Sequence, residues 1–404
     1  MTQILGQPCE FQVSAGSGTS WLSWDSQLTC SPSAHHHPAS LEELQSAIAS
    51  SPSVRVCANL SHSYSPIATA DGARQGASVS LDRLCLVTVD QEQGTVTAEA
   101  GATVSSIHIA LERVGRALPF TTALAAETIG GCVAAGTHGV GRRYGLLASL
   151  VISGTLVLPD GSIVTGTATA EPLVRASRVG LGLLGVWYSL TLRTVPAFQL
   201  VKRVTMIDAA ATFFAERVSE TLLEATDSVQ WFVYPATSSA KTYTRSIATA
   251  ADAAALPRCW NEAGTGATTA AVSCDAGYRS TSYPAAQWAE WGKQTESEYF
   301  LPQATAIDVA KAFIESVAEE DKGRFFLFGR YVAAGDHLLG PNQVDSVALT
   351  FVVPHDETNR GGNDERFNAL HAPFEVGHAS LPNLILWRLV CFWFWVSWRL
   401  AGTE

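Results

Sequence analysis

The run Gly136-Thr137-His138-Gly139-Val140-Gly141 follows closely on Glu127-Thr128-Ile129-Gly130-Gly131-Cys132, and the two make the most glycine-rich part of the chain's first half. Glycine has no Cβ, so backbone at such positions can approach a large flat ligand where side chains would collide. A glycine-rich turn between core strands would have the same composition. The pattern by itself leaves both interpretations open.

Upstream, His62 lies in the run Ser61-His62-Ser63-Tyr64-Ser65-Pro66, directly after a strand predicted at residues 54–57. The backbone amides of such a polar loop can form an anion nest for a pyrophosphate. A lone histidine in a loop is more commonly just solvated. His62 therefore needs further context before a role can be assigned.

Residues 180–185 (GLGLLG) match the dinucleotide fingerprint GxGxxG letter for letter. That motif works when a strand precedes it and a helix follows, because the helix N-terminus then faces the pyrophosphate. Here a helix predicted at 171–179 precedes, and a strand predicted at 186–192 follows. The reversed order argues against a Rossmann site.

The chain's 404 residues are too many for one compact core, so we expect two domains. A hydrophobic content of 47% with 16% charged residues is typical of a folded protein. The net charge of -11 argues against a nucleic-acid partner, because phosphate binding needs a basic face. A neutral small-molecule substrate is compatible with this charge.

Segregated helical and strand patterns predict an α+β fold rather than a regular βαβ series. Residues 248–272, rich in Ala, Thr and Gly, read as a surface insertion. Further helices are predicted at 41–49, 104–114 and 306–318, and further strands at 77–81, 86–89, 95–100, 150–158, 162–164, 231–234 and 346–353.

No two of the eight cysteines are spaced as a CxxC pair, so the sequence does not support a zinc or thiol-redox site. Their scattered positions favour reduced thiols in an intracellular protein. Residues 1–18 read as a loose tail without the basic start and apolar run of a signal peptide. Residues 35–37 (HHH) are interpreted as an exposed turn rather than a metal site, and His108 as a structural residue on its predicted helix.

Several motifs, in order and with fitting spacing, resemble the FAD domain of the vanillyl-alcohol-oxidase superfamily over roughly residues 21–200. Trp21 and Trp24 resemble the tryptophans that open that domain. The second half is similar to the aldonolactone and alditol oxidases. The matching segments are 61–68 (SHSYSPIA), 96–102 (VTAEAGA), 127–131 (ETIGG), 136–139 (GTHG), 181–186 (LGLLGV), 234–237 (YPAT), 297–302 (SEYFLP) and 330–336 (RYVAAGD).

The resemblance implies a two-lobed, PCMH-type FAD-binding domain followed by an α+β substrate or cap domain. The expected divisions are a tail at 1–20, the FAD domain at 21–197, the cap at 198–378 and an apolar C-terminal tail at 379–404. In many relatives the histidine matching His62 is bonded covalently to the flavin, and Arg330 matches a substrate-binding arginine. The residues implied to bind FAD are Asn59, Leu60, Ser61, His62, Ser63, Thr128, Gly130, Gly131, Gly136, Thr137, His138, Gly139, Gly185 and Val186.

The chain departs from this family at two places in the site. The family's pyrophosphate loop usually reads Gly-x-Gly-His-Ser, whereas residues 58–63 (ANLSHS) lack both glycines. The family also places a glutamate two residues before the arginine, where this chain has Phe328. In relatives this glutamate and the arginine together position the substrate's hydroxyl groups. We therefore expect the substrate site of this chain to lack its carboxylate.

A third departure concerns the C-terminus, where relatives carry a His-Trp-Gly-Lys motif. Here residues 384–400 (LILWRLVCFWFWVSWRL) are apolar and aromatic, with Arg388 inside them. Seventeen residues with an internal arginine lie at the short edge for a spanning helix. A peripheral membrane contact is one interpretation, and an altered C-terminus is the one we favour.

The resemblance implies an FAD-dependent oxidase of CH–OH groups that acts on an aldono-1,4-lactone, such as D-arabinono- or L-gulono-1,4-lactone, or on an alditol. Oxygen would be the acceptor and hydrogen peroxide the product. A dehydrogenase using another acceptor remains open, because Thr122 or Ala123 falls where relatives gate oxygen. The rival interpretation is a catalytically impaired paralogue or a membrane-tethered binding protein. The expected location is intracellular, either cytoplasmic or membrane-associated.

Overall fold

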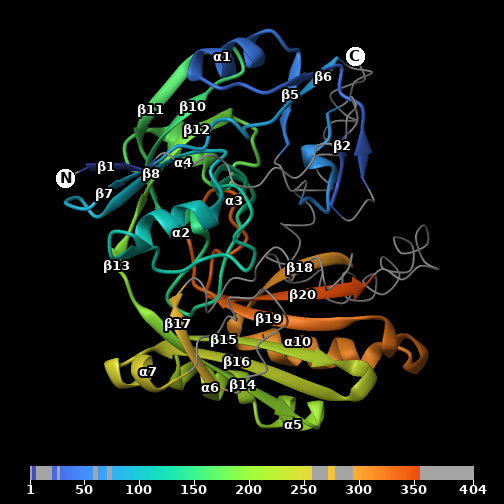
Figure 1. Cartoon of the computed structure of the whole chain (residues 1–404). Helices are drawn as coiled ribbons and strands as arrows, with labels where there is room; N and C mark the ends of the chain where they lie inside the picture. The colour runs from blue at the N-terminus through green and yellow to red at the C-terminus, as the bar shows by residue number, and fades with distance from the viewer. Residues whose placement is uncertain are drawn as a thin grey trace.

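The computed structural model describes residues 2–5, 21–24, 28–57, 62–70, 75–256, 272–277 and 294–354. These residues form two α+β lobes, one stacked above the other in Figure 1. The first lobe contains the elements up to β13 (Val195–Pro196), and the second begins with β14 (Gln199–Ile207). The predicted fold class is confirmed.

A six-stranded antiparallel sheet forms the centre of the first lobe, in the order β1-β7-β8-β12-β10-β11. Its strands alternate between core and surface residues, as period-two side-chain direction requires. The strands are β1 (Thr2–Leu5), β7 (Val87–Asp90), β8 (Thr95–Glu99), β10 (Val151–Val157), β11 (Ile163–Thr167) and β12 (Val186–Arg193).

Smaller sheets and helices complete this lobe. A parallel sheet of order β4-β6-β5 lies beside helix α1 (Leu41–Ala49), whose N-cap Ser40 accepts a hydrogen bond from Glu43 N. The remaining strands are β2 (Trp21–Leu22), β3 (Thr29–Cys30), β4 (Ala34–His36), β5 (Ser53–Val56), β6 (Gly76–Val79) and β9 (Arg116–Ala117), and the remaining helices are η1 (Pro66–Ala68), α2 (Val104–Glu112), α3 (Ile129–Ala135), η3 (Leu147–Leu150) and α4 (Pro172–Ser177).

A seven-stranded antiparallel sheet forms the second lobe, in the order β17-β14-β16-β15-β19-β20-β18. Helices α5, α6 and α10 contact one face of it. The further strands are β15 (Ser228–Tyr234), β16 (Ser239–Ile247), β17 (Val272–Ala276), β18 (Gln294–Pro302), β19 (Phe326–Val332) and β20 (Ser346–Pro354), and the helices are α5 (Ala210–Ala215), α6 (Val218–Ala225), η4 (Pro235–Thr237), α7 (Ala250–Ala255), α10 (Gln303–Ser316) and η5 (Glu319–Arg324).

Side chains along β19 alternate between the two faces of this sheet. Leu327 and Tyr331 are buried in the cluster formed with the helices, and Gly329 leaves room there for the Trp231 ring, which a Cβ would meet at 2.2 Å. Phe328 and Arg330 alternate with these residues and therefore point to the opposite face. That face meets the first lobe, since Val332, Phe300 and Ala348 pack in the core cluster of that lobe.

Most predicted elements match the structure closely, including the helix at 41–49 and the strand after GLGLLG. The reversed order around that motif is confirmed, because α4 precedes it and β12 follows. Three expectations are wrong. Residues 2–5 form strand β1, paired with β7, rather than a loose tail; residues 34–36 form strand β4 rather than a turn; and Cys85 is disulfide-bonded rather than reduced.

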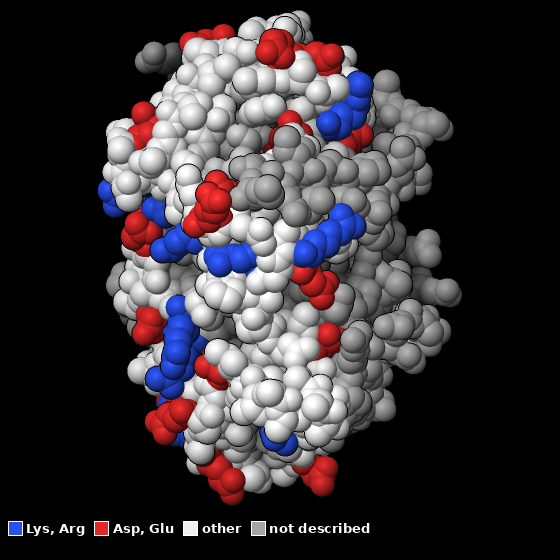
Figure 2. Space-filling model, turned by 60° about the vertical axis from the view of Figure 1, so that its left-hand side comes forward, with Lys and Arg blue, Asp and Glu red and all other residues white. Residues whose placement is uncertain are grey.

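Other expectations fall outside the described residues, among them the apolar C-terminal run. Within the described part of the chain, no helix is long and apolar enough to cross a membrane. On the face shown in Figure 2, acidic and basic side chains of the described residues are interspersed and form no continuous basic surface.

His108 is a core residue, as predicted. It is 2% exposed on α2, and its Nε2 lies 2.6 Å from Thr121 Oγ1. Burial lowers the pKa of His108 to about 3. A histidine that stays neutral in the folded protein but takes up a proton when unfolded destabilises the fold as pH falls.

We expect His108 to lower the free energy of unfolding by about 1.4 kcal/mol for each unit by which pH falls, between its ordinary pKa of 6.5 and about 3. In His108→Gln, urea unfolding midpoints measured at pH 7 and pH 5 should differ less than in the wild type. An unchanged difference between the two midpoints would contradict this assignment.

Candidate functional site

His62 lies at the junction of the lobes, in the loop after β5. Its Nδ1 is 3.3 Å from Glu127 Oε1. The Trp24 and Tyr64 rings lie beside it, with centroids 6.0 and 5.2 Å from that of His62. An imidazole held by a carboxylate and flanked by aromatic rings is suited to contact a planar ligand.

Glu127 connects His62 to the start of helix α3. The Cys132 thiol donates a hydrogen bond to Glu127 Oε2 at 3.2 Å, and burial together with that carboxylate raises the pKa of the thiol. Thr128 is the N-cap of α3 and accepts from Gly131 N. Among the described residues, a Cβ on Gly131 would meet Thr128 Oγ1 at 3.1 Å and no other atom within 4 Å, and the glycine itself is exposed.

The other glycines serve the packing of the protein itself. A Cβ on Gly130 would lie 2.9 Å from Ala100 O, and one on Gly139 would lie 2.0 Å from Thr121 O. Gly136 ends α3 in the left-handed region at φ 75°, and Gly185 lies against Val157 O at φ 156°. Gly130, inside α3, and Gly139 are therefore both needed for close packing of the backbone, and their contact with FAD stays a prediction.

His138 is buried between two hydrogen-bond acceptors. Its Nδ1 lies 3.0 Å from Gly139 O, and its Nε2 lies 2.9 Å from Glu298 Oε1 across the junction of the lobes. A carbonyl and a carboxylate oxygen can only accept, so a ring nitrogen that carries hydrogen can donate to either of them. His138 is 4% exposed, and its carboxylate partner comes from the second lobe.

Glu298 also binds Arg330. Arg330 Nη2 donates to Glu298 Oε2 at 2.6 Å, and Thr350 Oγ1 donates to the same oxygen at 2.7 Å. Burial alone would raise the pKa of Glu298, but His138, Arg330 and the hydrogen bonds outweigh it and hold the pKa well below its usual range. The carboxylate therefore stays ionised.

The expectation that Arg330 lacks its carboxylate is wrong. Phe328 does occupy the expected position, but β18 supplies Glu298 from across β20, because Glu298 and Phe328 both pair with Thr350. The Phe328 ring lies 5.3 Å from that of Phe232 and 5.1 Å from the Arg330 guanidinium. The arginine is thus held by a carboxylate and an aromatic ring together.

The segment SEYFLP resembles the family, but no role for Glu298 is predicted from that resemblance. One signal was available, since alternation of polar and apolar residues in 297–301 places Glu298 on the face opposite the core residues Tyr299 and Leu301. The partners of Glu298 could not be read in this way. His138 is 160 positions away in the sequence, and Arg330 is 32.

The remaining predicted cofactor residues divide into two groups. Ser63 Oγ donates to Ser65 O at 2.8 Å, Thr137 N donates to Cys132 O, and Val186 begins β12. Those in the second group, Asn59, Leu60 and Ser61, lie outside the described residues.

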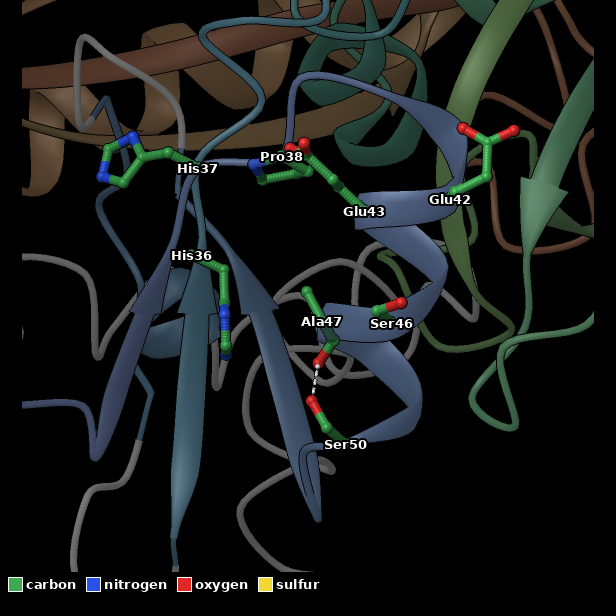
Figure 3. A pocket seen from close by; sticks show the side chains of 8 residues that line it. All are labelled: His36, His37, Pro38, Glu42, Glu43, Ser46, Ala47 and Ser50. Atoms are coloured by element: carbon green, nitrogen blue, oxygen red, sulfur yellow. Dashed lines mark hydrogen bonds between the residues drawn. The ribbon is translucent and has the colours of Figure 1, made fainter.

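A shallow groove between β4 and α1 lies apart from this junction (Figure 3). His36 and His37 line it with Glu42 and Glu43, but the two imidazoles point in different directions and away from the carboxylates. Among the described residues, no group of three or more His, Cys, Asp or Glu side chains could hold a metal.

Comparisons with known proteins agree with this geometry. Residues 32–167 match a family described as an FAD binding domain. The mouse (Mus musculus) L-gulonolactone oxidase is 33% identical over 191 residues, or 46% of this chain and 42% of that protein. The Mycobacterium tuberculosis L-gulono-1,4-lactone dehydrogenase is 33% identical over 230 residues, or 55% and 51%. The chain thus spans about half the length of the curated relatives it matches.

Among solved structures, a cholesterol oxidase from Brevibacterium sterolicum superposes with a TM-score of 0.73 at 15% identity, covering 93% of this chain and 86% of that one. The two-lobed fold is therefore confirmed. Residues 32–167 match an FAD binding domain, and about half of the chain is distantly similar to L-gulonolactone oxidases and dehydrogenases.

The residues present at the junction fit a flavin. Trp24 and Tyr64 flank His62, and Gly131 leaves backbone open at the start of α3. These residues, with Thr128, would hold the cofactor on the first lobe. A bound flavin would supply a hydride acceptor, which no protein side chain provides.

Proposed function

We propose that the chain belongs to an FAD-dependent oxidoreductase that oxidises the CH–OH group of an aldono-1,4-lactone or an alditol. The observation that carries this proposal is the Arg330–Glu298–His138 cluster at the junction of an FAD-binding lobe and a cap sheet. Charge-assisted groups of this kind orient hydroxyl and carbonyl groups of a substrate. Oxygen is the proposed acceptor, with hydrogen peroxide as product.

In this proposal the chain's own residues bind and orient the substrate. Arg330, fixed by Glu298 and Phe328, donates hydrogen bonds from its remaining N–H groups to a substrate oxygen. The other wall of this face is aromatic, since Phe232 packs on Phe328. Such a wall suits the apolar C–H face of a lactone ring and excludes water from the reacting carbon.

The first test is whether the purified protein holds flavin. We expect flavin to remain with the pellet after acid precipitation if His62 forms a covalent link, and His62→Ala to release it. His36→Ala, in the groove away from the junction, is the matched control and should change nothing. A protein that binds no flavin even with added FAD would refute the proposal.

If flavin is bound, anaerobic reduction by a panel of lactones and alditols identifies the substrate class. Peroxide release on adding oxygen distinguishes an oxidase from a dehydrogenase, for which a dye would be the effective acceptor. Flavin that no member of the panel reduces would support the rival, catalytically impaired protein.

A further inference from the structure

A second carboxylate lies on the same strand face as Glu298. Glu296 and Glu298 are two residues apart on β18, so their Cα atoms are about 6.6 Å apart and both side chains point toward the first lobe. Gln294, next along the same face, donates a hydrogen bond from Nε2 to Glu296 Oε1. The lobe junction therefore carries two adjacent carboxylates, of which only Glu298 has been given a role so far.

The two carboxylates differ in how far they are engaged. Glu298 binds His138, Arg330 and Thr350. Glu296, which like Glu298 is partly buried, has Gln294 as its hydrogen-bond donor within the described part of the chain, and its Oε2 receives no hydrogen bond there. Glu298 is committed to holding its neighbours, whereas Glu296 keeps an oxygen that can accept a proton.

The charges around Glu296 come from both lobes. His62 from the first lobe and Arg330 from β19 favour its ionised form, while Glu298 and above all burial oppose it, so the pKa of Glu296 is raised. The pKa of Glu298 is shifted in the opposite direction. Carboxyl pairs whose pKa values are pushed apart are typical of sites in which one group keeps its charge and the other exchanges a proton.

We propose that Glu296 is the base that takes the proton of the substrate hydroxyl, while Glu298 holds Arg330 and His138 in position. This inference rests on the proposed function. When an alcohol is oxidised, its O–H bond and the adjacent C–H bond break and a C=O bond forms. A bound flavin would accept the hydride, while Glu296 Oε2 takes the proton and passes it to water.

The variant Glu296→Gln tests this assignment, because it removes the base but keeps the shape and the acceptor for Gln294. With the lactone or alditol that reduces wild-type flavin fastest, we expect anaerobic flavin reduction to slow by about 100-fold or more. The substrate Kd should change little. Glu315→Gln, which alters an exposed carboxylate on α10 near Lys311, is the matched control.

The pH profile separates a base from a structural residue. In the wild type the reduction rate should rise with pH as Glu296 ionises, with an inflection above the ordinary value of 4.5. In Glu296→Gln that rise should be absent. A rate within about threefold of the wild type, or a slower rate with the same pH profile, would overturn the proposal.

A third readout does not depend on catalysis. The infrared carbonyl band of a protonated carboxyl group should disappear on titration above pH 4.5 in the wild type and be missing from Glu296→Gln. Absence of that band from the wild type would overturn the role of Glu296 even if flavin binding and substrate oxidation are found. Failure of the wild type to bind flavin would instead overturn the proposed function.

Discussion

Glu298→Gln is expected to destabilise the protein by about 3–5 kcal/mol, the usual cost of removing one partner from a buried ion pair. Glu298 is the shared counter-ion of His138 and Arg330, whose side chains are 4% and 12% exposed. Glutamine has the same shape but no charge, so it leaves the largely buried guanidinium of Arg330 facing a neutral amide.

Urea unfolding of Glu298→Gln and of Glu315→Gln measures this effect. The control breaks an exposed pair, with Lys311 and Glu315 51% and 65% exposed, and should cost less than about 1 kcal/mol. Equal effects in the two variants would show that Glu298 is not a buried counter-ion.

The pH dependence of the same variant has a definite sign. The pKa of Glu298 is lowered in the folded protein, so its stabilisation is complete above its ordinary pKa of 4.5 and is lost as pH falls below it. The stability difference between wild type and Glu298→Gln should therefore shrink in acid. A difference that grows as pH falls would contradict this assignment.

Gly139→Ala is expected to be the most damaging glycine substitution at the site. The new Cβ would lie 2.0 Å from the Thr121 carbonyl oxygen and 3.1 Å from its carbon, so backbone must move on one side or the other. Overpacking of this kind costs about 1–3 kcal/mol or more. Because His138 precedes Gly139, the shift would also displace His138 from Glu298.

Thermal unfolding of Gly139→Ala and Gly323→Ala provides the comparison. No described residue lies within 4 Å of the ideal Cβ of Gly323, so its replacement should leave Tm nearly unchanged. In Gly139→Ala we expect Tm to fall by roughly 2–4 °C for each kcal/mol of unfolding free energy that is lost. We also expect the variant to retain less flavin. Unchanged flavin retention despite a lower Tm would separate the packing role of Gly139 from the geometry of His138.

The sequence by itself determined the local structure of this protein. Ser40 and the apolar spacing after it predicted α1 to the residue, and the order of elements around GLGLLG correctly argued against a Rossmann site. Such features depend on neighbours a few positions apart, which determine hydrogen bonding and side-chain direction. The ordered motifs from His62 to Gly139 likewise identified the FAD-binding lobe.

Only the tertiary structure decided which side chains meet. Phe328 stands where relatives have a glutamate, and Glu298 from another strand binds Arg330 instead. The further partner of Glu298, His138, comes from the other lobe. Gly139 is required by the close approach of the Thr121 backbone. These contacts depend on strand order and register, which bring distant segments within hydrogen-bond range and leave no periodic signal in the sequence.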